Sequence, residues 1–169
     1  MRDEVVSPVG RRFPEVAGQA LSRERVRLPG DLAGAPAVLL VAYERRTQDD
    51  IDRWSAFLER EIPELAAYEV PTIPSLVWRP LSSWIDAGMR GGVPHELWSR
   101  VVTLYEDGAK VRAFLGDRRG GRAHVTLLDA DGVVRWFAAE GFSEAAGHSL
   151  ARTLADLPDR GPAAEEGAT

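Results

Sequence analysis

Charged and hydroxyl side chains follow directly after a long apolar run in the first third of the chain. Residues 37–43 are apolar throughout, and Glu44, Arg45, Arg46 and Thr47 come next. Helical spacing of apolar residues begins after Thr47, and the first turn of a helix offers unpaired N–H groups and the positive end of a dipole. Two arginines at that point favour binding of a carboxylate or phosphate. The alternative is a solvated turn whose N–H groups are satisfied by its own acidic residues.

A second basic region lies between residues 110 and 122. Its cations are Lys110, Arg112, Arg118, Arg119 and Arg122. They form either an anion-binding patch or an ordinary solvated loop, because exposed arginines are common on protein surfaces. His124 follows in an apolar segment, where it could titrate near neutral pH and act as a base. The alternative for His124 is a packed or hydrogen-bonded strand residue.

A tryptophan-rich segment separates these two regions. Trp78, Trp84 and Trp98 occur there together with Ile85 and Met89. An exposed aromatic cluster of this kind marks a surface for a protein partner or an apolar ligand. If the cluster is buried, it is the core of the segment itself.

Other chemistry is excluded by what the sequence lacks. It contains no cysteine, so thiolate nucleophiles, disulfide exchange and thiolate metal sites are excluded. His95 and Glu96 lack the second histidine of a zinc-protease helix, and the acids at Asp129 and Asp131 lack calcium-loop spacing. No phosphate loop, dinucleotide fingerprint or nucleophile elbow is present. We therefore assign no catalytic residue and expect no cofactor and no metal.

Composition places the chain among ordinary globular proteins. It has 169 residues, of which 44% are hydrophobic and 28% charged. The net charge of −5 argues against general nucleic-acid binding, which needs a concentrated positive field. The N-terminus has no apolar signal region, and no segment is apolar over the ~20 residues that span a bilayer. We expect a soluble, cytoplasmic protein with no membrane span.

Strand and helix signals alternate along the chain, which is typical of an α/β domain. Strand signals cover residues 25–28, 37–43, 68–74, 101–105, 124–129 and 133–137. Helix signals cover residues 47–65, 81–100, 108–115 and a final segment after Ser143. Thr47 and Asp50 have the spacing of a capping box at the start of the first helix. The turn at residues 129–132 predicts a hairpin.

The chain divides into one domain with irregular ends. Residues 1–20 carry scattered prolines, glycines and charges, and we expect them to form an irregular arm. Residues 21–157 hold the alternating elements and form the domain. Residues 158–169 lack apolar periodicity, which predicts a disordered tail.

Residues 102–108, 111–116 and 122–135 resemble the peroxiredoxin succession of strand, short helix, arginine, strand and hairpin. This resemblance implies a thioredoxin-like (peroxiredoxin-like) α/β fold, with a central mixed β-sheet flanked by helices on both faces. Redoxins of this class place their nucleophilic thiol where the strand at residues 37–43 meets the following helix, and this chain has no thiol there.

The hairpin has a narrower resemblance. It is similar to the carboxy-terminal signature of the mitochondrial ATP-synthase assembly chaperones, a thioredoxin-like family, over Leu128-Asp129-Ala130-Asp131-Gly132-Val133-Val134-Arg135-Trp136, with Gly141 and Glu144 following. The helix that carries Trp54 also resembles that family. The resemblance implies a non-catalytic chaperone, although the chain has no organelle presequence to support the same partner.

The redoxin resemblance also brings the two basic regions together. It implies that Arg122 faces the vacated thiol position and that Ala123 and His124 lie where thioredoxins carry a cis-proline loop. We therefore expect Arg45 or Arg46, Thr47, Arg122 and His124 to line one shallow pocket for a small anion or an acidic side chain.

The function expected from the sequence is non-catalytic binding. Without its cysteine, a thioredoxin-like domain can act as a binding, scaffold or assembly-chaperone-like protein with a protein partner. The alternative is an enzyme or small-anion-binding protein that reuses the vacated cleft, with Glu44 and His124 as its acid–base pair.

Overall fold

The computed structural model describes residues 7–72, 100–116 and 121–158. Seven strands and three α-helices lie in this part of the chain. The strands are β1 (Val16–Ala20), β2 (Arg25–Leu28), β3 (Ala37–Ala42), β4 (Ala66–Pro71), β5 (Val102–Thr103), β6 (His124–Leu128) and β7 (Val134–Ala138). The helices are α1 (Gln48–Glu61), α3 (Gly108–Leu115) and α4 (Glu144–Asp156), and the helix predicted at 81–100 falls almost wholly outside the described residues.

A four-stranded mixed sheet in the order β4-β3-β6-β7 forms the centre of the molecule. β3 runs parallel to β4 and antiparallel to β6, and all six of its residues are buried. A strand covered on both faces needs apolar side chains on both, which the continuous run of residues 37–42 supplies. The predicted central strand is confirmed.

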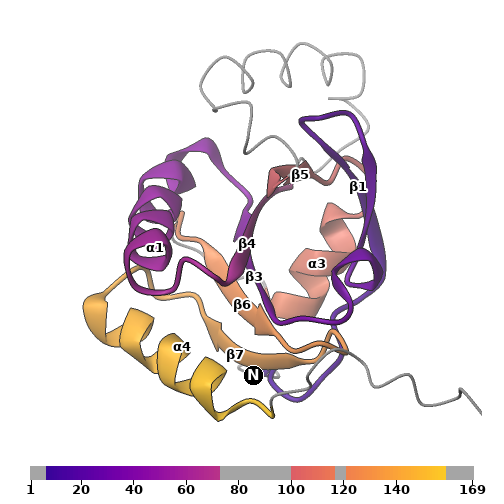
Figure 1. Cartoon of the computed structure of the whole chain (residues 1–169). Helices are drawn as coiled ribbons and strands as arrows, with labels where there is room; N and C mark the ends of the chain where they lie inside the picture. The colour runs from indigo at the N-terminus through magenta and orange to yellow at the C-terminus, as the bar shows by residue number, and fades with distance from the viewer. Residues whose placement is uncertain (1–6, 73–99, 117–120, 159–169) are drawn as a thin grey trace, which may run out of the picture.

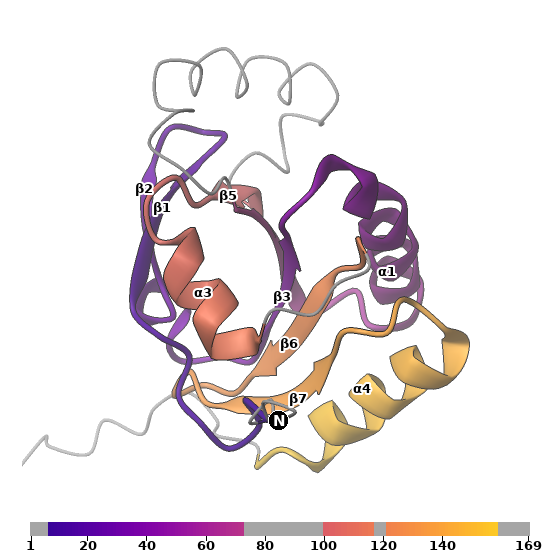
Figure 2. The same ribbon diagram turned by 180° about the vertical axis from the view of Figure 1, so that it is seen from behind.

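Helices cover both faces of this sheet, as Figures 1 and 2 show. Val38 and Leu40 of β3 pack against α1 and α4 in one hydrophobic core. Leu39 and Val41 point the other way, into a second core with α3. The period-two alternation of β3 therefore supplies both cores, and the predicted α/β class with flanked sheet is confirmed.

A smaller sheet, β2-β1-β5, extends the structure beyond β4. Isolated bridges from Glu69 to Val101 and from Thr72 to Leu104 connect the two sheets. The expected irregular arm is wrong for residues 16–20, which form β1. Gly18 lies within this strand. A Cβ at this position would lie 2.7 Å from Leu104 Cδ2, so the close approach of the two segments requires glycine.

Local signals at the end of the chain are confirmed. The Asp129 side chain accepts hydrogen bonds from the backbone N–H groups of Asp131 and Val133 at 2.9 and 3.0 Å, and Gly132 has a φ of +80°. These contacts close the predicted hairpin. Ser143 caps α4 by accepting from the Ala146 N–H at 3.0 Å. Within the described residues, no helix has the length and apolar character that crossing a membrane requires.

Candidate functional site

The junction between β3 and α1 is the first candidate site. After Ala42 the chain passes through Tyr43 and Glu44 into a 3₁₀ turn, Arg45–Thr47, and α1 starts at Gln48. The Arg46 Nε donates to the Glu44 carboxylate, so the first acid of the junction pairs with one of its arginines. Thr47 is 1% exposed and donates its N–H to the Glu44 carbonyl at 3.1 Å.

The predicted capping box between Thr47 and Asp50 is wrong. Thr47 makes no side-chain cap hydrogen bond. Asp50 instead accepts the backbone N–H of Ala123 at 2.9 Å and that of Phe142 at 2.7 Å. These donors are 73 and 92 residues further along the chain, so local spacing could not reveal them. Asp50 ties the start of α1 to the loops before β6 and before α4.

Arg46 and Arg122 come to the same region of the surface. Gly121 has a φ of +61°, and a Cβ on it would lie 2.5 Å from the Arg46 Nε, so the Arg46 side chain passes directly over the residue before Arg122. Arg122 is exposed, and its guanidinium donates to the Glu140 carbonyl beside Gly141. The structure therefore places the Arg46 side chain against the loop that carries Arg122, whose own side chain lies at Glu140 and Gly141.

His124 lies below this surface. It is 1% exposed and packs edge to face with Tyr43 and Phe137, at ring-centroid distances of 4.9 and 5.8 Å. The guanidinium of Arg112 lies 4.6 Å from the centre of the Tyr43 ring. Buried in this aromatic layer, His124 supports the junction from within in this structure.

The other predicted residues have different places. The Nζ of Lys110, in the first turn of α3, lies 3.5 Å from the Oδ1 of Asp107, the residue just before the helix, and the two form an ion pair. Arg45 is in the 3₁₀ turn, and nothing is described of its side chain. The tryptophans proposed as a partner surface, Trp78, Trp84 and Trp98, lie outside the described residues, as do Arg118 and Arg119.

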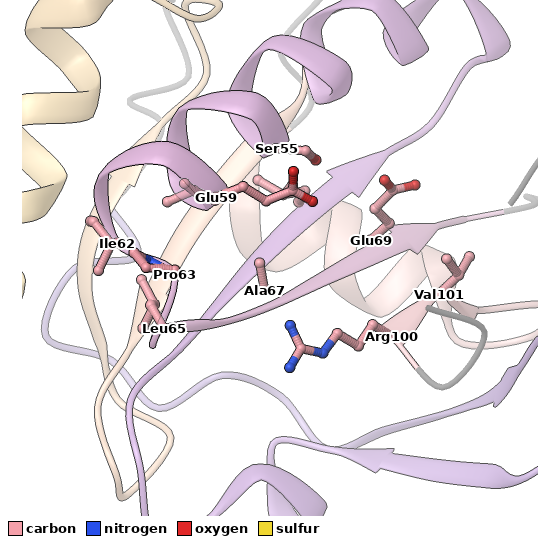
Figure 3. A pocket seen from close by; sticks show the side chains of 11 residues that line it. Ser55, Glu59, Ile62, Pro63, Leu65, Ala67, Glu69, Arg100 and Val101 are labelled. Carbon is pink, nitrogen blue, oxygen red and sulfur yellow. The ribbon is translucent and has the colours of Figure 1, made fainter. Parts of the chain in front are cut away.

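A pocket that the sequence did not predict lies between α1 and β4 (Figure 3). Its volume is about 130 Å³. Its walls are mostly apolar, and its charged residues are Glu59, Glu69 and Arg100. Glu69 stands opposite Leu40 in the register of β3 and β4, on the sheet face that packs against α1. The only local hint of this pocket in the sequence is an acid, Glu69, within an otherwise largely apolar strand segment.

The electrostatics of Glu69 differ from those of an ordinary surface acid. Burial, followed by the negative charge of Asp52, raises the pKa of its carboxyl, and a hydrogen bond from Gln48 opposes the shift. In the part of the chain that the structure describes, no arginine, lysine or histidine forms an ion pair with Glu69. Within the same residues, no group of three or more histidine, aspartate or glutamate side chains is arranged to hold a metal ion.

Solved structures with a similar arrangement of elements include two whose names identify them as thiol redox proteins and one uncharacterized protein. The thioredoxin domain of a thiol-disulfide oxidoreductase from Bacteroides vulgatus aligns with a TM-score of 0.58 at 15% identity, over 86% of this chain and 97% of that one. The peroxidoxin BcpB from Mycobacterium tuberculosis aligns with a TM-score of 0.56 at 19% identity, over 90% and 99%. An uncharacterized conserved protein from Geobacillus kaustophilus aligns with a TM-score of 0.60 at 16% identity, over 96% and 88%.

These likenesses define the class of fold. The chain has a thioredoxin-like α/β fold without the cysteine on which thiol redox chemistry depends. No family model matches the sequence, and no curated protein matches it. The resemblance of its hairpin to the assembly chaperones therefore stays a prediction.

Proposed function

We propose that this protein is a non-catalytic thioredoxin-like binding protein, and that its vacated thiol junction recognises an acidic group of a protein partner. The observation that carries the proposal is the position of the Arg46 side chain against Gly121, the residue before the exposed Arg122, next to the start of α1. Two guanidinium groups on neighbouring loops can hold a carboxylate or phosphate through charge-assisted hydrogen bonds. The junction then serves recognition in place of catalysis.

The contacts within the chain leave donors for a ligand. A guanidinium carries five N–H groups. Among the described residues, Arg46 uses its Nε for Glu44, and Arg122 donates to the Glu140 carbonyl. Glu44 also occupies part of the site, so an incoming anion competes with it for Arg46. Binding at this exposed place should be weak, since each exposed charge pair contributes only about 0.2–1 kcal/mol.

The resemblance of residues 128–136 to assembly chaperones supports a protein as the partner, in a scaffold or chaperone-like role in the cytoplasm. The absence of cysteine supports a role without thiol turnover. Fold likeness alone does not define the partner.

Titration of the full chain with inorganic phosphate, followed by amide NMR shifts, tests the proposal. Amides of residues 46–50 and 121–124 should shift in a saturable way, and the affinity should fall as sodium chloride rises. Arg122→Ala should weaken phosphate binding about threefold to fivefold, the loss expected when one exposed charge contact is removed. Arg152→Ala, an exposed arginine on α4, is the matched control and should leave the affinity unchanged.

A second variant acts in the opposite direction. Glu44→Gln removes the carboxylate that competes for Arg46 and should tighten phosphate binding. If the junction amides do not shift, or if Arg122→Ala and Glu44→Gln both bind phosphate like the wild type, the junction is only a structural turn and the proposal is wrong.

A further inference from the structure

The pocket between α1 and β4 has an apolar body. Its walls are formed by Leu40, Leu58, Ile62, Leu65 and Ala67, with Val101 at one side. A volume of about 130 Å³ is well below the roughly 300–1,000 Å³ of pockets for drug-sized ligands. The space therefore suits a short aliphatic group rather than a ring system or a nucleotide.

The charged groups of the pocket are divided by sign. In Figure 3 the carboxylates of Glu59, on α1, and Glu69, on β4, point toward the same part of the pocket. The guanidinium of Arg100 lies apart from both of them. Among the described residues no ion pair joins Arg100 to either glutamate. The pocket thus presents a negative region and a separate positive group around an apolar surface.

Glu69 is the pocket carboxylate whose burial is least compensated by contacts within the described residues. A half-buried carboxylate without a cationic partner is costly, because burial removes part of its hydration. Its hydrogen bond from Gln48 compensates only in part, and Asp52 adds a second negative charge nearby. A ligand ammonium placed between Glu59 and Glu69 would supply the missing positive charge.

From this arrangement we infer that the pocket binds a small aliphatic amino acid in its zwitterionic form. The ammonium of the ligand pairs with Glu59 and Glu69, its carboxylate pairs with Arg100, and its branched side chain packs on Leu40, Leu58 and Ile62. This site is separate from the vacated thiol junction, and it does not depend on the function proposed for that junction.

Three probes of similar shape and different charge test the inference on the full chain. L-leucine carries both charges, 3-methylbutylamine only the ammonium, and 4-methylpentanoate only the carboxylate. Amide NMR shifts at Ser55, Ala67 and Val101 report binding in the pocket. L-leucine should bind about tenfold more tightly than either singly charged analogue, because it gains a further charge-assisted contact.

Variants assign the two ends of the ligand. Glu69→Gln should weaken L-leucine and 3-methylbutylamine about fivefold to tenfold. Arg100→Gln should weaken L-leucine and 4-methylpentanoate and spare 3-methylbutylamine. Glu64→Gln and Arg53→Gln are matched controls, since both residues are exposed and neither lines the pocket. Neither control should change any of the three affinities.

A filling variant keeps the test independent of charge. Ala67→Met places a longer side chain in the pocket and should abolish the amide shifts caused by L-leucine. The amide spectrum of the variant should otherwise remain that of the folded protein. The inference is overturned if L-leucine gives no saturable shift at Ser55, Ala67 or Val101. It is also overturned if 4-methylpentanoate binds as tightly as L-leucine, or if the Glu69→Gln and Ala67→Met proteins bind L-leucine like the wild type. Arg122→Ala should leave L-leucine binding unchanged. The amino-acid site in the pocket and the anion site at the junction can therefore be contradicted independently of each other.

Discussion

Asp50 and Glu69 are both carboxylates beside helix α1, and the chain uses them in opposite ways. Asp50, at the start of α1, accepts two backbone N–H groups from distant loops at 2.9 and 2.7 Å. Glu69, at the pocket beside the second half of α1, has no ion-pair partner among the described residues, and burial raises the pKa of its carboxyl. The comparison separates a carboxylate that holds the fold together from one that is available for a ligand.

The largest expected effect is at Asp50. Asp50→Ala leaves the N–H groups of Ala123 and Phe142 without their acceptor, and we expect a loss of about 2–4 kcal/mol in the free energy of unfolding. Urea unfolding followed by circular dichroism measures this loss. Asp49→Ala is the matched control, because Asp49 is exposed in the same turn, and it should change stability by less than about 0.5 kcal/mol. If the two variants have equal free energies of unfolding, the structural role assigned to Asp50 is wrong.

Asp129, like Asp50, is a carboxylate that stabilises the fold, and we expect its contribution to the free energy of unfolding to depend on pH. Burial alone raises the pKa of its carboxyl, but hydrogen bonds from Arg135 and from the N–H groups of Val133 and Asp131 together lower it below the usual value. A lowered folded-state pKa means that the stabilisation is present above the unfolded value of 3.8 and is lost as the pH falls through the folded value.

Asp129→Asn should therefore cost about 1 kcal/mol at neutral pH and less in acid. Urea unfolding at pH 7 and at pH 3 measures both values. Asp131→Asn is the matched control, an exposed acid in the same turn. A cost for Asp129→Asn that stays constant with pH would contradict the assignment.

Glu69 should have the opposite pH dependence and the smallest effect. A raised folded-state pKa means that the folded protein binds a proton more readily than the unfolded chain, so stability declines as the pH rises from the unfolded value of 4.5 through the folded value. Glu69→Gln removes the buried charge and should stabilise the protein by less than about 1 kcal/mol at pH 7, and by nothing at pH 4.

Thermal unfolding of Glu69→Gln at both pH values, against Glu64→Gln, measures this difference. If Glu69→Gln destabilises the protein at pH 7 as Asp50→Ala does, then Glu69 is also a structural carboxylate and the comparison fails.

The sequence predicted the parts of the fold whose signals are local. The continuous apolar run of β3, the turn from Asp129 to Gly132 and the Ser143 cap each depend on neighbours within a few residues. β1 was missed because Gly18 indicates a loop locally, whereas the strand needs glycine for contact with residues 102–104. Residues 16–20 form a strand because they pair with β5, which is distant in the sequence.

The candidate sites divide in the same way. The sequence named Arg46 and Arg122, and a resemblance to redoxins was needed to place them together. The role of Asp50 was misassigned because its partners are more than 70 residues away. The pocket at Glu69 was missed because its walls come from α1, β3, β4 and residues 100–101, which only the folded chain brings together.

The central claim is that this thioredoxin-like domain has no thiol redox activity, and redox assays on the purified full chain test it most directly. Insulin reduction and peroxide consumption would be measured with dithiothreitol as the electron donor, after metal removal with a chelator. We expect both rates to equal the rate of buffer alone, since no residue of the chain can form a thiolate. Peroxide consumption above the buffer rate that follows the protein through successive columns, and persists in the Arg122→Ala variant, would contradict a non-catalytic role.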